Sequence, residues 1–202
     1  INKITQETYS PFVYLTRPHA TLEREMKESE ALRDFLVFYG LDIKNLKRIE
    51  CYDVSNFQGT NATGSMTVFI NGSEERSEYR KFKIRSKSTP DDFAMHQEVM
   101  SRRLKHPEWD FPDLFIIDGG KGQVSSVMQV FASKNIQIPV IGLAKKFETF
   151  IVPQKLTQGY EFLEVKIPNS SPALNLARRI RDEAHRFAIT YHKTLRAKSV
   201  FK

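Results

Sequence analysis

The hydrophobic positions of the chain predict the centre of a β-sheet. Four consecutive apolar residues, Leu114 to Ile117, end at a carboxylate and two glycines. A short continuous apolar run of this kind is typical of a strand buried on both faces. A second apolar run covers residues 138–146, and residues 48–57 alternate between two faces as a strand does. We therefore expect a strand in each of these three segments.

Turn and capping residues divide the rest of the chain. Asn71-Gly72, between residues 64–70 and 77–85, predicts a β-hairpin because this pair readily supplies the positive φ angles of a tight turn. A second hairpin is expected over residues 147–167. Capping residues and amphipathic spacing predict helices over about 21–39, 92–104, 122–133 and 172–198.

The order of these elements predicts an α/β domain with a mixed sheet, because strands and hairpins alternate with helices along the chain. The 202 residues are enough for one sizeable core. We place the domain at residues 48–202 and interpret residues 1–47 as an N-terminal adapter with one helix. Because the chain begins at Ile1 rather than at Met, we expect it to be a piece of a longer protein.

Composition narrows the class of protein. Hydrophobic residues make up 40% of the chain and charged residues 27%, which is typical of a soluble globular domain. No apolar run approaches the roughly 20 residues of a membrane span, so no membrane association is expected. Cys51 is the only cysteine, which excludes an internal disulfide and favours the cytoplasm as location. We interpret Cys51 as a small core residue.

A basic excess is concentrated at the C-terminal end. Residues 178–202 hold eight of the 31 Lys and Arg residues but only two of the 24 Asp and Glu residues, so they carry six of the seven net positive charges. Such a segment suggests a polyanion as partner. A solvated helix face would explain the same charges, and this alternative stays open.

Asp53 is the first candidate for chemistry. It shares a strand face with Cys51 and Ser55, and burying an unpaired carboxylate on such a face is costly. One explanation is a structural ion pair or a capped turn. The other is a metal ligand, since a strand holds an oxygen rigidly for a hard cation such as Mg²⁺ or Mn²⁺.

Asp118 is the second candidate. It follows a buried strand directly, at the end where α/β sheets usually bind ligands. Gly119 and Gly120 would let a backbone approach a ligand closely, and Lys121 places a positive charge at the entrance of the next helix. The spacing is not that of a Walker A phosphate loop. An ordinary turn explains the same residues, so this position alone is not decisive.

His185 is the third candidate. At 100° per residue, the core face of the last helix is centred about 120° away from His185, which shares its flank with Arg178 and Arg181. A solvated flank is the simpler explanation. A titratable imidazole among phosphate-binding groups is the functional one. Together, two carboxylates, one imidazole and a basic surface suit metal-assisted cleavage of a phosphodiester.

Four segments carry a resemblance to a known family. RIECYDVSNFQGTNATGSM, PDLFIIDGGKGQ, IPVIGLAKK and SPALNLARRIRDEAHRFAITYH resemble the C-terminal endonuclease domain of UvrC, an excinuclease of bacterial nucleotide excision repair. The match covers about residues 47–198. It implies a ribonuclease H-like fold, with a mixed five-stranded sheet flanked by helices and an added β-hairpin.

The resemblance also implies an activity and its residues. The family makes the incision 5′ to a lesion in damaged double-stranded DNA, within a complex that contains UvrB. Its Asp-Asp-His metal site falls on Asp53, Asp118 and His185, with Mg²⁺ or Mn²⁺ as the ion. A further family aspartate falls on Asp92, for which we expect a supporting role. We add Lys121, Arg178 and Arg181 as phosphate contacts, because of their charge and position.

Three departures and two rival interpretations remain. Asn56 stands where the family usually has histidine, the match lacks the family's N-terminal nuclease module and its UvrB-binding segment, and it stops before the tandem helix-hairpin-helix region that the family carries next. We therefore expect this fragment to bind DNA weakly, and we also expect it to be a monomer. A non-catalytic ribonuclease H-like scaffold for DNA or protein would show salt-dependent binding without cleavage. A phosphate-ester hydrolase for small molecules is disfavoured by the C-terminal basic charge.

Overall fold

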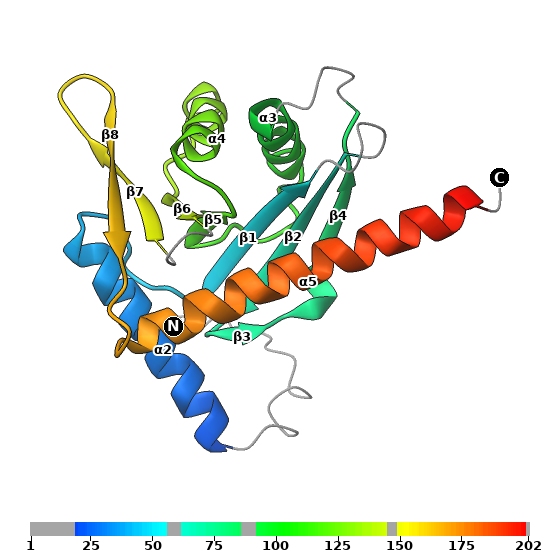
Figure 1. The fold of residues 1–202 in the computed structure, drawn as a ribbon. Helices are drawn as coiled ribbons and strands as arrows, with labels where there is room; N and C mark the ends of the chain where they lie inside the picture. The colour runs from blue at the N-terminus through cyan, green and yellow to red at the C-terminus, as the bar shows by residue number, and fades with distance from the viewer. Residues whose placement is uncertain (1–18, 56–61, 86–91, 145–148, 201–202) are drawn as a thin grey trace, which may run out of the picture.

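The computed structural model describes residues 19–55, 62–85, 92–144 and 149–200, with side chains as far as Tyr191. In this part of the chain, eight strands pair into one sheet in the order β3-β2-β1-β5-β6-β7-β8, with β4 also paired to β2 (Figure 1). The strands are β1 (Arg48–Ser55), β2 (Thr63–Ile70), β3 (Ser73–Glu74), β4 (Arg80–Lys83), β5 (Leu114–Ile117), β6 (Val140–Ala144), β7 (Thr149–Lys155) and β8 (Tyr160–Lys166).

The sheet is mixed, as the sequence predicted. β5 runs parallel to both β1 and β6, whereas β2 runs antiparallel to β1 and β7 antiparallel to β6. Strands β4, β2, β1, β5 and β6 form the expected five-stranded part, and the hairpin of β7 and β8 continues the same sheet beyond β6. Because β1, β5 and β6 are parallel, their C-terminal ends lie along one edge of the sheet. We call this the C-terminal edge.

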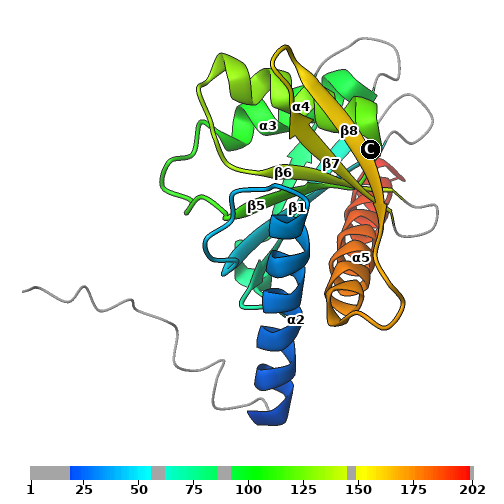
Figure 2. The same cartoon turned by 90° about the vertical axis from the view of Figure 1, so that its left-hand side faces the viewer.

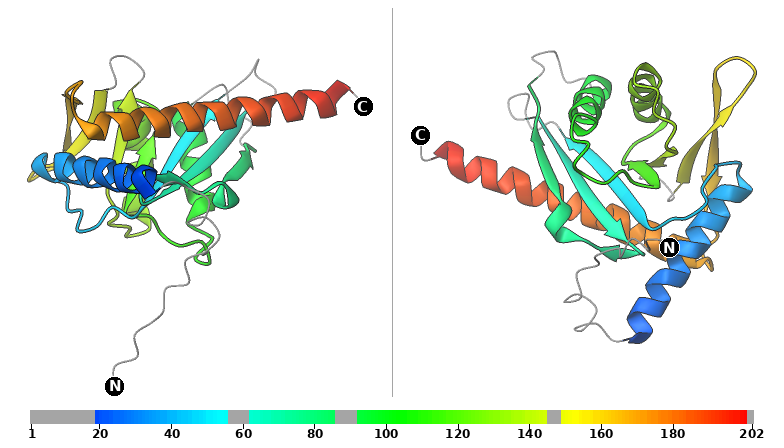
Figure 3. Two further views of the ribbon diagram at one scale, coloured as in Figure 1. Left: turned by 90° about the horizontal axis from the view of Figure 1, so that it is seen from below. Right: turned by 180° about the vertical axis from the view of Figure 1, so that it is seen from behind.

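Helices cover both faces of the sheet (Figure 2). The helices α3 and α4 lie together on one face, and α2 and α5 lie together on the other, where the view from below shows them next to each other (Figure 3). No helix in the described residues is both long enough and apolar enough to cross a membrane. The helices are α2 (His19–Phe38), α3 (Asp92–Arg103), α4 (Lys121–Ser133) and α5 (Pro172–Val200).

Alternate residues of the central strands face the two helical layers. Cys51 and Ile116 belong to the hydrophobic core shared with α2 and α5. Their neighbours Tyr52 and Ile117 belong to the core shared with α3 and α4. The side chain of Cys51 is buried, as predicted from its place in a strand. Each of the two central strands therefore contributes to both cores, which explains why residues 114–117 are apolar without interruption.

The helix predicted within residues 1–47 packs onto the sheet. Leu32 and Leu36 of α2 are completely buried in the core that contains α5. A guanidinium nitrogen of Arg179 lies 2.7 Å from a carboxylate oxygen of Glu28, which ties α5 to α2. Residues 1–18 lie outside the described part of the chain, and the domain boundary at residue 47 stays a prediction.

The predicted turn at Asn71-Gly72 has the expected backbone, with φ angles of 50° and 78°. The chain returns first as the two-residue strand β3, then through the 3-10 helix η1 (Arg76–Glu78), and then as β4. Both β3 and β4 pair with β2, so the returning strand of this hairpin is interrupted. The second hairpin, β7 and β8, also forms where it was predicted.

A buried ion pair connects β1 to α3. The side chains of Glu50 and Arg103 are both fully buried, and Arg103 donates hydrogen bonds of 2.9 Å to each carboxylate oxygen of Glu50. Arg48 and the hydroxyl group of Tyr52 also donate to this carboxylate. Burial, followed by the neighbouring Glu50 charge, raises the pKa of Tyr52 well above its usual value. The hydroxyl group of Tyr52 therefore stays protonated and able to donate.

We expect Arg103→Met to lower the free energy of unfolding by about 3 kcal/mol or more, because removal of one partner leaves a buried charge without full compensation. Urea unfolding followed by circular dichroism measures this loss. Arg102→Met is the matched control, since Arg102 pairs with Glu98 nearer the surface and should cost about 1 kcal/mol or less. Equal losses for the two variants would contradict the prediction.

Candidate active site

Asp53 and Asp118 lie side by side on neighbouring strands. In the parallel register Cys51 faces Ile116 and Tyr52 faces Ile117. The pairing continues for one more residue, because the backbone N–H of Asp118 donates to the carbonyl oxygen of Tyr52 at 2.8 Å. Alternation along each strand directs both aspartates to the face that carries α5. Two carboxylates far apart in sequence thus meet at the C-terminal edge.

The pKa of Cys51 is affected by both carboxylates, which places them near its thiol. Burial raises the pKa of Cys51 well above its usual value, and the negative charges of Asp118 and Asp53 raise it further. The side chain of Asp53 is only 6% exposed, and both carboxylate oxygens of Asp118 are buried. Both acidic groups therefore lie close enough to one buried thiol for their charges to act on it.

Helix α5 brings His185 to the two aspartates. Its Nδ1 lies 3.9 Å from Oδ2 of Asp53, and its ring is 58% exposed. A cavity of about 180 Å³ opens beside it, lined by Asp118, Arg181, Asp182 and His185. Asp182 was not among the residues predicted from sequence. Its spacing of three residues before His185, on the same flank of a helix, is the signal that could have identified it.

The position of α5 is set by small residues and by one buried carboxylate. Ala177 and Ala184 are buried against the sheet, and they allow the helix to pack closely. Glu183 is 6% exposed and accepts two hydrogen bonds of 2.6 Å from Arg186. Burial opposes ionisation of Glu183, but the interactions with Arg186, Tyr79 and Arg76 together outweigh it and lower its pKa. Arg76, next to β3, lies 3.7 Å from the same carboxylate. This contact links α5 to the short helix η1, which lies between β3 and β4 in the chain.

The loop after β5 packs against β6 at a glycine. A Cβ atom on Gly142 would lie 2.7 Å from the carbonyl oxygen of Gly119. Gly120 donates its backbone N–H to the side chain of Gln123 at 3.0 Å, which closes the loop onto α4. The two loop glycines were interpreted as room for a ligand. In the structure Gly119 is packed against protein, and Gly120 has more open space around it.

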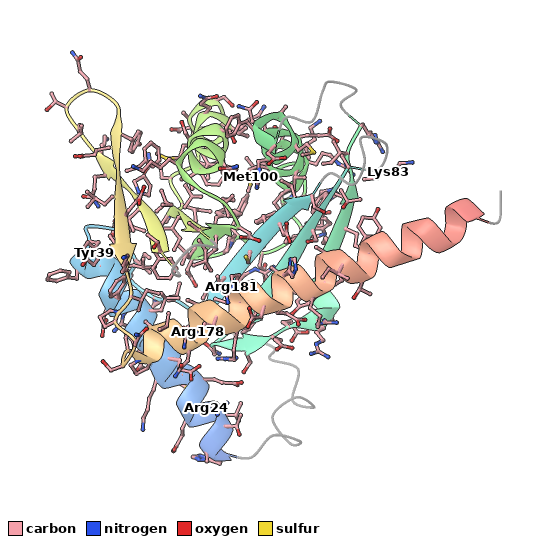
Figure 4. The ribbon with its side chains drawn as sticks, in the orientation of Figure 1. Arg24, Tyr39, Lys83, Met100, Arg178 and Arg181 are labelled. Carbon is pink, nitrogen blue, oxygen red and sulfur yellow. The ribbon has the colours of Figure 1, made fainter. Side chains whose placement is uncertain are left out.

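The three predicted phosphate contacts lie at the C-terminal edge or on α5, in different settings. Arg181 lines the cavity and donates a 3.0 Å hydrogen bond to Asp182. Arg178 is exposed on the same helix, one turn before Arg181 (Figure 4). Lys121 is half exposed, and its ammonium group lies 3.2 Å from Glu164 of β8. The side chains of α5 beyond Tyr191 lie outside the described part.

Asp92 occupies a different place from the other predicted residues. It is the exposed first residue of α3, on the opposite face of the sheet from α5, and it does not line the cavity. Its carbonyl oxygen lies 2.7 Å from Nδ1 of the buried His96. The structure therefore shows Asp92 at a helix start. Asn56, where the sequence departs from the family, lies outside the described residues.

The donor atoms suit a hard divalent cation, although they do not enclose one. Carboxylate oxygens are ligands for Mg²⁺ or Mn²⁺, whereas an imidazole nitrogen suits transition metals better than it suits Mg²⁺. Among the residues that the structure describes, no three His, Cys, Asp or Glu side chains are grouped closely enough to hold a metal ion. Asp53 and Asp118 are held by the sheet, whereas the exposed ring of His185 can turn. The two carboxylates are of the chemical type that fits such an ion.

Solved structures give a loose likeness. Endonuclease V of Ciona intestinalis, in complex with a 24mer DNA containing an inosine followed by a ribo-adenosine, is 13% identical with a TM-score of 0.46. The alignment covers 87% of this chain and 99% of that chain. Endonuclease V of Streptomyces avermitilis is 15% identical with a TM-score of 0.42, covering 82% and 93% of the two chains.

Relatives found by sequence comparison have a much higher identity to this chain than these solved structures have. The UvrABC system protein C of Chlorobium phaeobacteroides is 42% identical over 183 residues, which are 87% of this chain and 28% of the relative. The protein of the same name from Prosthecochloris aestuarii is 47% identical over 155 residues, or 75% and 24% of the two chains. This chain thus spans about a quarter of the length of the curated relatives that it matches.

The family match agrees with the resemblance seen in the sequence. Residues 39–189 match the family described as UvrC RNAse H endonuclease domain. This range includes β1, β5 and most of α5, and therefore all three residues at the C-terminal edge. Because the match covers most of the chain, the chain belongs to the family of UvrC RNAse H endonuclease domains.

Proposed function

We propose that this chain is a metal-dependent DNA endonuclease domain that makes the 5′ incision at damaged DNA in nucleotide excision repair. The observation that carries the proposal is the meeting of Asp53 and Asp118 at the C-terminal edge, with His185 of α5 only 3.9 Å from Asp53. A divalent ion held between Asp53 and Asp118 would offset the repulsion between their two carboxylates. Membership of the endonuclease family supports the same conclusion.

Asp53 and Asp118 would hold the ion, and His185 would serve as a third ligand or as a proton carrier. When bound, the ion would polarise the phosphate and lower the pKa of the attacking water. Asp53 and Asp118 are fixed by neighbouring strands, so they bind without first having to be ordered. The exposed ring of His185 can turn toward substrate and can accept or deliver a proton there.

The cationic side chains would orient the substrate. Arg181 lines the cavity, Arg178 lies one turn away on the outer flank of α5, and Lys121 begins α4 at the same edge. Their charges would position the phosphate backbone of duplex DNA across the cavity, without reading its sequence. Lys121 is paired with Glu164 and Arg181 with Asp182, so each would exchange a carboxylate for a phosphate.

As partners we propose damaged double-stranded DNA and UvrB.

One observation favours a second candidate function. The described side chains do not form a group that holds a metal ion as they stand. A non-catalytic scaffold of the same fold would bind DNA or protein through α5 and would need no such group. The two candidates differ in one measurable property, which is affinity for a divalent cation at Asp53 and Asp118.

We expect Mn²⁺ to bind the wild-type chain, and Asp53→Asn and Asp118→Asn each to weaken that binding at least tenfold, because each removes a charged ligand. Electron paramagnetic resonance of free Mn²⁺ measures this directly. His185→Ala should weaken binding less if the ring carries a proton, and as much if it is a ligand. Asp34→Asn, an exposed change on α2, is the control and should have no effect.

The same variants test cleavage. In a reconstituted incision reaction with the whole protein, Asp118→Asn should abolish the 5′ incision while circular dichroism shows a folded chain. Undiminished 5′ incision by this variant would rule out the proposed site. Mn²⁺ binding that does not depend on either aspartate would favour the non-catalytic scaffold.

A salt titration tests the phosphate contacts. The double variant Arg178→Gln, Arg181→Gln should lower DNA affinity and reduce the slope of log K against log salt by about two, since each phosphate contact contributes about 0.9. Fluorescence anisotropy with a labelled duplex gives both quantities. The control is Arg24→Gln, Lys27→Gln, which removes the same charge from exposed positions on α2. An equal change of slope in the control would show a general charge effect instead of a defined contact.

A further inference from the structure

Strand β4 carries a row of positive charges on the same face of the sheet as the candidate active site. The exposed residues Lys81, Lys83 and Arg85, the last just beyond the strand, alternate with the buried Phe82 and Ile84. Phe82 and Ile84 belong to the core shared with α3 and α4, so alternation directs the three cations to the face that carries α5. We call Lys81, Lys83 and Arg85 the β4 strip.

Strand pairing connects the β4 strip to Asp53. Asp53 of β1 is opposite Ser65 of β2, and Ser65 is in turn opposite Lys81 of β4. Neighbouring strands are about 4.8 Å apart, so the backbones at Asp53 and Lys81 are separated by roughly 10 Å. Because β2 is antiparallel to both β1 and β4, these two strands run in the same direction. Lys83 and Arg85 therefore follow Lys81 toward the C-terminal edge, where the candidate active site lies.

Two aromatic rings of α5 hold Lys81 in place without neutralising it. Its ammonium nitrogen lies 5.1 Å from the ring centre of Phe187 and 5.2 Å from that of Tyr191. Cation–π contacts of this kind attract a lysine but leave its positive charge uncompensated. Within the described residues, no carboxylate forms an ion pair with Lys81, Lys83 or Arg85. The β4 strip thus presents three positive charges that the described part of the fold leaves without a carboxylate partner.

The neighbouring part of α5 extends this positive surface. The helix contains no Asp or Glu after Glu183, and its last turns run on beyond the strands of the sheet (Figure 1, Figure 3). Residues 79–90, which include β4, contain five Lys or Arg residues and no Asp or Glu. A strand and a helix segment of one charge sign therefore lie beside each other, as is typical of a surface that binds nucleic acid.

Strand β8 shows that protection of a sheet edge does not explain this pattern. It is the last strand at the other end of the sheet, and edge strands commonly carry charges that keep other chains from pairing with them. The charges of β8 are mixed, because Glu161 and Glu164 accompany Lys166. Mixed charges would protect β4 equally well. The single sign of the charges on β4 therefore favours a polyanion as partner.

We propose that the β4 strip is a phosphate-binding track that holds one arm of duplex DNA beside the candidate active site. This inference rests on the proposed function for the identity of the ligand. Phosphates of one DNA strand follow each other about every 3.4 Å along the axis, so Lys81 would meet a phosphate roughly three base pairs from the one at Asp53. Such contacts position the duplex without reading its sequence. The track also sets the side on which the duplex leaves the site, over β4 and not over β8.

Removal of charge from the β4 strip tests the track. We expect Lys83→Gln, Arg85→Gln to bind a labelled duplex about tenfold or more weakly at low salt and to lower the slope of log K against log salt by about two, because each phosphate contact contributes about 0.9. Fluorescence anisotropy in EDTA measures both quantities without cleavage. The matched control is Lys105→Gln, Lys134→Gln, which removes the same charge from exposed positions just after α3 and α4. An unchanged slope in the strip variant, or an equal change in the control, would overturn the track.

Lys81 separates a phosphate contact from a packing role. Lys81→Gln should weaken binding to the duplex, whereas Lys81→Arg keeps both the charge and the contact with the rings of α5 and should bind like wild type. Circular dichroism checks that both variants are folded. Wild-type affinity in Lys81→Gln, or an equal loss in the two variants, would remove Lys81 from the track.

A directed cleavage experiment tests the side on which the duplex lies. Cys51 is the only cysteine and is buried, so a single exposed cysteine can be labelled selectively. An iron–EDTA chelate attached to Lys83→Cys should cut the bound duplex when ascorbate and peroxide are added. The same chelate on Glu161→Cys, an exposed position of β8, should not cut it. Cutting from β8 alone, or from neither position, would contradict the proposed path.

The outcomes distinguish this inference from the proposed function. In a reconstituted incision reaction with the whole protein, the strip variant should raise KM much more than it lowers kcat, as expected for contacts made with substrate and transition state alike. If DNA binding depends on the β4 strip but no divalent ion binds at Asp53 and Asp118, the track stands and the nuclease assignment fails. If Mn²⁺ binds and cleavage occurs while the strip variant behaves as wild type, the nuclease assignment stands and the track fails.

Discussion

The parallel register of β1 and β5 is the constraint on which the candidate site depends. It places Asp118 directly beside Asp53, one step beyond the pair formed by Tyr52 and Ile117. Side chains alternate strictly along a strand, so a slip of one residue would send one carboxylate to the face covered by α3 and α4. The apolar residues of both strands prevent such a slip, because it would also exchange the two hydrophobic cores.

The second requirement is a fixed position for α5. This helix brings an imidazole, a guanidinium and a further carboxylate to the two aspartates. Its contacts include the alanines that allow close packing, other buried apolar residues such as Leu174 and Ile180, and the buried Glu183, which lies near Arg76. Helix α2 packs against α5, and the pair of Arg179 with Glu28 joins the two helices, so the helix predicted within residues 1–47 also supports the position of α5.

The sequence predicted the features that depend on residues close to one another in the chain. Two-sided burial of residues 114–117, the turn at Asn71-Gly72 and the amphipathic last helix all follow from spacing, and each element formed where it was expected. Spacing could not reveal contacts between distant segments. Two such contacts form only when the sheet has assembled. They are the close approach of Gly142 to the loop after β5 and the pairing of Lys121 with Glu164.

The amino-acid sequence alone determined the α/β class, the family and three candidate residues, because alternation, capping and motif residues are properties of short segments. Tertiary structure alone decided that Asp53 and Asp118 are neighbours and that His185 reaches Asp53 from a different layer. Distances between side chains on different elements depend on strand order and helix packing. These in turn depend on residues throughout the chain. For the same reason, only the folded chain placed Lys81 two strands away from Asp53.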